Sequence, residues 1–194
     1  IFFYLTHIHT VNAVMRAEGA TAAMMQHATM HTLVSILSAA ISTLYIKMIS
    51  IFCILLMIHV IFEPIEIHNW RGALMMFLLV WASGVAIGIV FMAAKPWMPD
   101  AVNIASLIYI RANMIFSGKM FVANMMPAFM LPMFTWNPIF HVIDQARGFI
   151  FVNYVPHITT WVFPLVFTAA AFLFGMMLDA YTRKNASASW EARR

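Results

Sequence analysis

Polar residue types that could handle a hydroxylated or charged ligand gather between two apolar segments, in WNPIFHVIDQARGFIFVNY, Trp136 to Tyr154. Asn137 can cap the free amide groups of a helix start and Pro138 tolerates the first helical position, so we expect a short helix at Asn137–Ile150. The two sides of this helix differ: the apolar side has Ile139, Ile143, Ala146 and Ile150, and the polar side has His141, Asp144, Gln145 and Gly148. The helix is too short to cross a bilayer, and its polar side should face water or a passing substrate.

Catalysis is not indicated by these polar residues. His141 and Asp144 have the spacing of an acid–base pair, but no Ser, Cys or Thr lies between Thr135 and Thr159 to act as a nucleophile. Asp144 and Arg147 are instead expected to pair locally at i, i+3. The sequence also has no GxxxxGK[ST] phosphate loop, so any ATP hydrolysis must come from a partner chain and no cofactor is expected in this one.

A cation and several aromatic residues lie just before this helix. Arg111, in IYIRANMIF, is costly inside a membrane, so we expect it in the bundle interior near Asn113, either on the path of an anionic substrate or in a structural hydrogen bond. Lys119 can either snorkel or serve a function. The aromatic residues of this region should form an interfacial belt and core packing, with some on a substrate path; they are Tyr109, Phe116, Phe121, Phe134 and Trp136.

A histidine pair elsewhere leaves an alternative open. His27 and His31 are four residues apart and would share one helix face, a spacing that can bind a metal or haem. No Cys, Asp or Glu nearby supplies a third ligand, so we predict no metal site. A redox or membrane-anchoring subunit with His ligands is the alternative function.

The composition is that of an integral membrane protein. Of 194 residues, 63% are hydrophobic and 9% are charged, whereas a soluble domain has roughly a quarter charged. The single cysteine, Cys53, lies in an apolar run and is expected to be a buried, inert thiol. The net charge of +4 comes from scattered basic residues, so no nucleic-acid partner is expected.

Four crossings and a re-entrant segment are expected in a single all-α transmembrane domain over residues 1–194. About 20 apolar residues cross a bilayer. Segments of about that length are Ile41–Phe62, Ala73–Ala94 and Thr160–Ala180, with Asn103–Gly118 as a shorter fourth. Residues Lys119–Ile150 then form a re-entrant helical hairpin, in which Lys119–Met126 is a helix that turns back before Pro127 and Pro132.

Helix packing and orientation can also be predicted. Gly84 and Gly88 form a small-xxx-small pattern that would let another helix approach closely.

Four crossings put Arg16 and the C-terminal tail, residues 181–194, on one side, together with Lys95 and with Lys47 at a helix end. The positive-inside rule makes that side cytosolic. The chain opens in apolar residues without Met, so residues 1–10 are expected to be the end of a truncated span.

These segments resemble a known family. The order VNAVMRAEGA, paired spans, FSGKMFVANMMPAFMLPMF and WNPIFHVIDQARGFIFVNYVPH before a last span resembles the permease subunit of ABC-type exporters of capsular polysaccharide, O-antigen and teichoic acid. Asn137, Pro138, His141 and Arg147 match the Asn-Pro block that ends the re-entrant gate in that family. The resemblance extends from about Val11 to Arg183.

The resemblance implies a function and partners. It implies an N-terminally truncated permease in a bacterial inner membrane, with a cytosolic C-terminus, that works as a homodimer with two ATPase subunits and exports a lipid-linked glycan. Residues 11–31 would be the cytosolic coupling region, with Arg16 and Glu18 as polar contacts to the ATPase. The substrate path and gate would carry the polar and aromatic residues Tyr109, Arg111, Phe116, Trp136, Asn137, His141, Asp144, Gln145 and Arg147.

Overall fold

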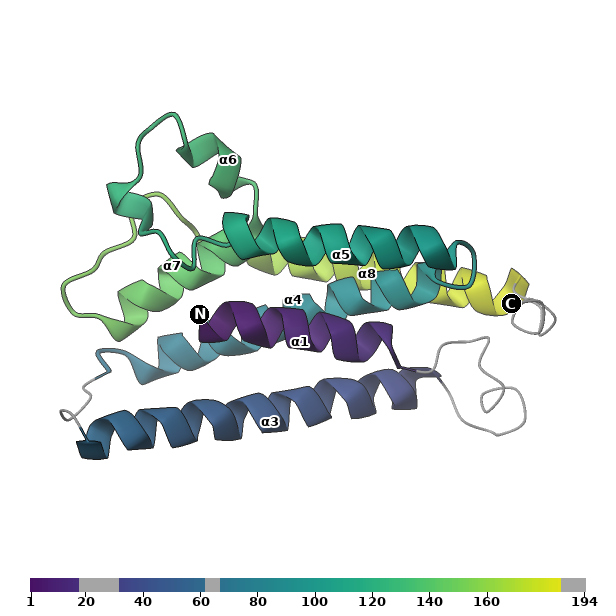
Figure 1. Ribbon diagram of the computed structural model, residues 1–194, viewed down its shortest axis with the longest axis horizontal. Coiled ribbons are helices and arrows are strands. Elements are labelled where there is room, and N and C mark those ends of the chain that lie inside the picture. Colours follow the sequence, from purple (N-terminus) through teal and green to yellow (C-terminus); the bar gives the residue numbers. More distant parts are fainter. Residues whose placement is uncertain (18–31, 62–66, 186–194) are drawn as a thin grey trace.

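All of the regular structure in the described residues is helical. The computed structural model describes residues 1–17, 32–61 and 67–185. Its helices are α1 (Phe2–Met15), α3 (Thr32–Ile61), α4 (Trp70–Ala94), α5 (Pro99–Phe116), the 3-10 helix η1 (Ala123–Met125), α6 (Leu131–Thr135), α7 (Pro138–Ile150) and α8 (Val162–Asn185). The long helices run side by side along the bundle (Figure 1). The prediction of an all-α membrane helical bundle is confirmed.

Three helices, α3, α4 and α8, are long and apolar enough to cross a membrane. They contain most of the predicted spans at 41–62, 73–94 and 160–180; α4 ends at Ala94 as predicted, and the other boundaries differ. α4 begins at Trp70 because the Asn69 side chain caps the helix and accepts the Gly72 N–H at 3.0 Å. α8 continues to Asn185, so the predicted tail begins with helix. The predicted fourth span corresponds to α5, which is shorter and more polar and is not among the three.

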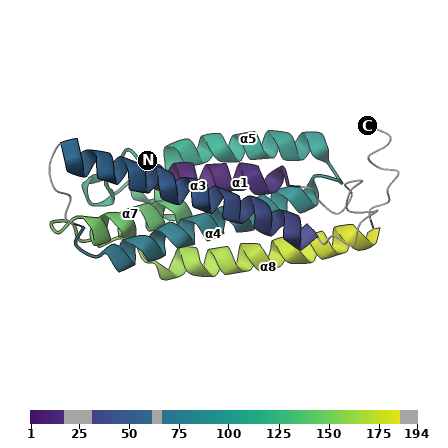
Figure 2. The ribbon, with the colours of Figure 1, turned by 90° about the horizontal axis from the view of Figure 1, so that it is seen from below.

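α4 is the centre of the bundle, with α1 on one side and α8 on the other (Figures 1 and 2). A Cβ atom added at Gly84 would lie 2.8 Å from the His7 carbonyl oxygen, and one at Gly88 would lie 2.7 Å from the Val14 side chain. The absence of side chains at both glycines therefore lets α1 approach α4 closely. The predicted small-xxx-small contact is confirmed, and its partner is α1.

α1 extends further than the sequence suggested. It continues as one helix to Met15, and the Val11 and Val14 side chains are fully buried against the bundle. Val11, Val14 and Met15 therefore pack into the core, and α1 continues past the boundary predicted at residue 11. Arg16 and Ala17 follow the helix, and Glu18 with the rest of residues 18–31 lies outside the described residues.

α3 packs through its first turns only, where Thr32, Ile36 and Ala40 are buried. Its remaining turns separate from the bundle (Figure 1). Two predictions about this helix are wrong. Lys47 lies halfway along α3 and not at a helix end, because the helix begins at Thr32. Cys53 is exposed because it lies beyond Ala40, the last buried residue of α3.

The segment between α5 and α7 is less regular than predicted. Gly118 has φ +67°, a left-handed conformation that glycine adopts without steric cost, and it ends α5 in a tight turn. Lys119–Met126 contains only the short 3-10 helix Ala123–Met125, so the predicted helix there is wrong. The helix α6 follows, and the predicted helix Asn137–Ile150 is confirmed as α7 with Asn137 as its cap.

Candidate functional site

α7 begins close to the middle of the bundle. The Asn137 side chain accepts the Ile139 N–H at 3.0 Å, and its amide donates to Asn113 Oδ1 of α5 at 2.9 Å. At the other end of α7, Phe149 packs over Gly72 and its carbonyl accepts the Asn69 N–H. Ten residues separate Phe149 from Ile139, which at 1.5 Å per residue is about 15 Å, or about half of a bilayer core. α7 therefore runs beside the first half of α4 only.

His141 is held by backbone groups on both of its ring nitrogens. Its Nδ1 accepts the Thr160 N–H at 3.1 Å, so Nε2 carries the proton and donates to the Thr135 carbonyl at 2.7 Å. The ring also packs against Phe163, 5.0 Å away between centroids. Only 7% of His141 is exposed, so the prediction that it faces water is wrong.

Asp144 is completely buried and accepts two hydroxyl hydrogen bonds. Tyr154 donates to Oδ1, and Thr159 donates to Oδ2 at 2.8 Å. Burial, and then the bond to Asp144, raise the pKa of the Tyr154 phenol. The predicted Asp144–Arg147 pair is wrong, because the segment after α7 supplies the partners of the carboxylate.

Gln145 is half-buried and completes this cluster. Its side-chain amide donates to the Thr159 carbonyl at 2.7 Å and to Thr159 Oγ1 at 3.1 Å. The Thr159 hydroxyl thus accepts from Gln145 and donates to Asp144. The polar side of α7 is therefore bonded to neighbouring parts of the chain, to Thr135 before the helix and to Tyr154, Thr159 and Thr160 after it.

Arg147 ties α7 to the turn after α5. Its guanidinium donates to the carbonyls of Phe121 at 2.6 Å, Gly118 at 2.8 Å and Lys119 at 3.3 Å. These carbonyls belong to backbone that the Gly118 turn leaves outside any helix, and the Gly118 carbonyl also accepts the Phe121 N–H at 3.3 Å. Arg147 supplies donors, and it fixes the turn beside α7.

A second polar cluster at mid-bundle was not predicted. The Val80 carbonyl can only accept, so His7 Nδ1 carries the proton and donates to it at 3.4 Å and to Ser83 Oγ at 2.9 Å. His7 Nε2 then accepts from Tyr109 Oη at 2.8 Å. Asn113 donates to the Tyr109 carbonyl at 3.0 Å. This network joins α4, α1 and α5 and, through the Asn113–Asn137 bond, reaches the start of α7.

The predicted aromatic residues divide into two environments. Tyr109 is part of the His7 network and also packs its ring against Phe91, with centroids 5.8 Å apart. Phe116 packs against Phe134 at 5.6 Å and Trp136 at 6.3 Å. Trp136 is 63% exposed, so of these rings it is the one most accessible to a ligand.

Arg111 is exposed on the outer side of α5, which corrects the prediction that it lies in the bundle interior. The inner side of that helix carries Tyr109 and Asn113, and Arg111 is on the opposite side. Ser83, the partner of His7, lies at the centre of α4, so the neighbouring Tyr109 and Arg111 are close to mid-depth. An exposed guanidinium at this depth is costly in lipid unless an anion or water meets it.

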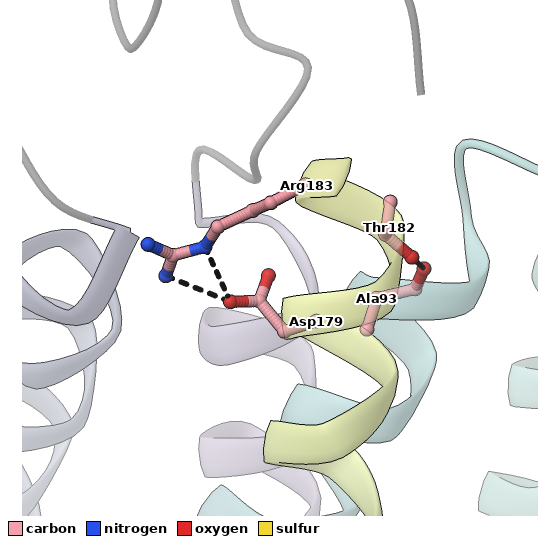
Figure 3. A network of polar contacts seen from close by, with 4 residues as sticks. All are labelled: Ala93, Asp179, Thr182 and Arg183. Atoms are coloured by element: carbon pink, nitrogen blue, oxygen red, sulfur yellow. Dashed lines mark hydrogen bonds and ion pairs between the residues drawn. The ribbon is translucent and has the colours of Figure 1, made fainter. Parts of the chain in front are cut away.

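The opposite end of the bundle carries positive charge and an ion pair between the exposed Arg183 and the buried Asp179. Arg183 donates from Nε and Nη2 to Asp179 Oδ2 at 2.9 and 2.8 Å (Figure 3). Beside it, the Thr182 hydroxyl donates to the Ala93 carbonyl at 3.0 Å and accepts from the Trp97 indole at 2.9 Å. The basic residues at this end are Arg16, Lys95, Arg183 and Lys184.

A metal site is not found in the part of the chain that the structure describes, where no three His, Cys, Asp or Glu side chains cluster. His27 and His31 lie outside the described residues, so the histidine-ligand alternative stays a prediction.

Comparison with known proteins adds no family assignment. No protein-family model matches the chain, and no curated protein matches it. The fold and the spans define the class, an all-α integral membrane protein.

Proposed function

We propose that this protein is the permease subunit of an ATP-driven ABC exporter that moves a lipid-linked polysaccharide across a bacterial inner membrane. The observation that carries the proposal is the half-length helix α7, which begins beside Asn113 and ends beside Asn69. Protein covers its polar groups, as a re-entrant segment at membrane depth requires. Its sequence is also the block with the most specific resemblance to the exporter family.

Arg111 supports a polar or anionic substrate. Its side chain is exposed close to mid-depth, and the ion pairs of the described residues include no carboxylate bound to it. A hydrophilic path along the outer side of α5 gives this charge a favourable partner, whereas lipid tails do not. A second copy of the chain that faces α5 would close such a path.

The basic end of the bundle supports the side proposed for the ATPase. Positive residues favour the cytosolic side, and Arg16, Lys95 and Lys184 lie at this end. We place the ATPase contact there, at Arg16 and the residues that follow it, with the C-terminus cytosolic. ATP is bound and hydrolysed by the partner subunit.

The test is co-expression with the ATPase of the neighbouring reading frame in cells that lack their own permease. We expect the two chains to co-purify and surface glycan to return. A cysteine at Arg16 should crosslink to the ATPase, and the matched control at Arg71, at the other end of α4, should not.

The orientation has its own test. Phe129 is 78% exposed at the end opposite Arg16, so a cysteine there should react with an impermeant thiol reagent from outside the cell. The control at Lys95 should react only after permeabilisation, and Cys53 is replaced by Ser in all variants. ATPase crosslinks at Arg71, or cytosolic labelling at Phe129, would reverse the orientation.

A further inference from the structure

α5 has little apolar contact with the rest of the bundle. Its buried residues are Val102, Ser106 and Asn113, and of these only Val102 is apolar. Most of its other apolar side chains are exposed, among them Ile104, Leu107, Ile108 and Ile115. Close packing and hydrogen bonds hold membrane helices together, so a helix with this little packing depends on its hydrogen bonds.

Hydrogen bonds at two neighbouring residues tie α5 to α1, which lies beside it (Figures 1 and 2). Tyr109 Oη donates to His7 Nε2 at 2.8 Å. The Tyr4 hydroxyl donates to the Ile110 carbonyl at 3.3 Å. The bond between Tyr109 and His7 is the shorter of the two and the stronger tie.

Further polar contacts follow within the next two or three turns. Asn113 Oδ1 accepts from the Asn137 amide at 2.9 Å and joins α5 to the start of α7. Just beyond the helix, the Lys119 ammonium lies 4.1 Å from the centroid of the Tyr4 ring. The hold on α5 is therefore largely polar, and it is concentrated in the second half of the helix.

His7 is fixed from its other side by α4. Its Nδ1 donates to Ser83 Oγ at 2.9 Å and to the Val80 carbonyl at 3.4 Å. These bonds do not involve α5, so the imidazole keeps its place and its tautomer when Tyr109 leaves. The bond between His7 and Tyr109 can thus break and form again without disturbing the packing of α1 on α4.

We propose that the His7–Tyr109 hydrogen bond is a latch, and that α5 swings away from α1 when the latch opens. Separation exposes little buried apolar surface, and hydrogen bonds between membrane helices are individually weak. The groups that it releases are a phenol hydroxyl and an imidazole nitrogen, which water or a hydroxylated molecule satisfies and lipid tails do not. The latch therefore opens toward a hydrated space. This movement goes beyond the proposed function, because it does not depend on which substrate is carried.

Tyr109→Phe tests the latch because it removes the hydroxyl and keeps the ring that packs against Phe91. Tyr4→Phe removes the longer bond and should have a smaller effect in the same direction. The matched control is Tyr181→Phe, the same change on an exposed ring of α8.

The experiment measures how fast a buried thiol reacts with a small neutral maleimide in the purified full chain, in detergent and with Cys53 replaced by Ser. The probe is Ser106→Cys, which is buried on α5 three residues before Tyr109 and reacts when α5 moves away. The reference is Thr168→Cys, buried on α8. Tyr109→Phe should raise the reaction rate of Ser106→Cys about threefold, the factor that corresponds to one average hydrogen bond between membrane helices. The rate of Thr168→Cys should not change, and Tyr181→Phe should leave both rates as they are.

Two results would overturn the latch. One is an unchanged rate at Ser106→Cys in Tyr109→Phe, since the bond would then not control the separation of α5. The other is an equal rise at Thr168→Cys, which would mean that the whole bundle loosens. If the latch fails while the chain still co-purifies with the ATPase and restores surface glycan, the proposed function stands and only this inference is lost.

Discussion

Replacing His141 with Ala tests whether the polar side of α7 is scaffold or solvated surface. The change removes the partner of the Thr135 carbonyl, which is half-buried, and of the Thr160 N–H, which lies on an exposed residue. Water can satisfy Thr160 more easily than Thr135. One orphaned group and the loss of the second bond give an expected destabilisation of about 1–3 kcal/mol.

The melting temperature in detergent measures this effect directly. For a chain of this length, 1 kcal/mol corresponds to about 2–4 °C, so His141→Ala should lower the Tm by about 2–12 °C. Trp136→Ala is the control because that side chain is 63% exposed, and its effect should stay within about 0.5 kcal/mol. Equal melting of His141→Ala and the unchanged protein would refute the packing described above and restore the solvated face that the sequence suggested.

The remaining predictions use the same assay. Asp144→Ala should cost about 1–3 kcal/mol because it leaves two hydroxyl donors unpaired, the buried one of Thr159 and the part-buried one of Tyr154. Asp144→Asn should cost less because it keeps one acceptor, and equal losses would argue against these bonds. The Tyr154 pKa is raised above its ordinary 10.0, so the stability that the phenol contributes should be complete below pH 10 and fall as the pH rises further. The difference in stability between the unchanged protein and Tyr154→Phe measures this contribution. A difference that already shrinks below pH 10 would contradict the prediction. Gly84→Ala places a Cβ 2.8 Å from the His7 backbone oxygen and should cost about 1–3 kcal/mol, more than Gly175→Ala, which meets a side-chain methyl at 3.0 Å; the reverse order would argue against close α1–α4 packing.

Local signals in the sequence predict the elements of this fold well. Long apolar runs give the three spans, and Asn137-Pro138 gives the start of α7, because capping and hydropathy depend on neighbouring residues. Gly84 and Gly88 indicate a close helix contact, but the pattern does not name the partner helix. α1 is that partner, and its buried Val11 and Val14 look like any apolar residues in the sequence.

The partners of polar residues could not be predicted in the same way. Asp144 is bonded to Tyr154 and Thr159, which are ten and fifteen residues away, while the nearer Arg147 turns to the carbonyls of another segment. His7 has no ligand spacing in the sequence, and tertiary packing alone brings it to Ser83. Side-chain spacing along one helix describes what can pair, and the approach of a distant segment decides what does.

The bonds of α7 also predict how it would move in a gate. Arg147 holds the turn at Gly118–Phe121, and Asp144 holds the segment at Tyr154–Thr159, so α7 should move together with both and not slide past them. Arg147→Met would release the turn while leaving the Asp144 bonds intact. We expect faster amide hydrogen exchange at 118–121 in this variant, with little change at 154–160, because opening of the turn no longer requires α7 to move. Equal acceleration in both segments would mean that α7 as a whole depends on Arg147. No acceleration at 118–121 would mean that the Gly118 turn is held by its own backbone, and that the guanidinium bonds add nothing to the unit.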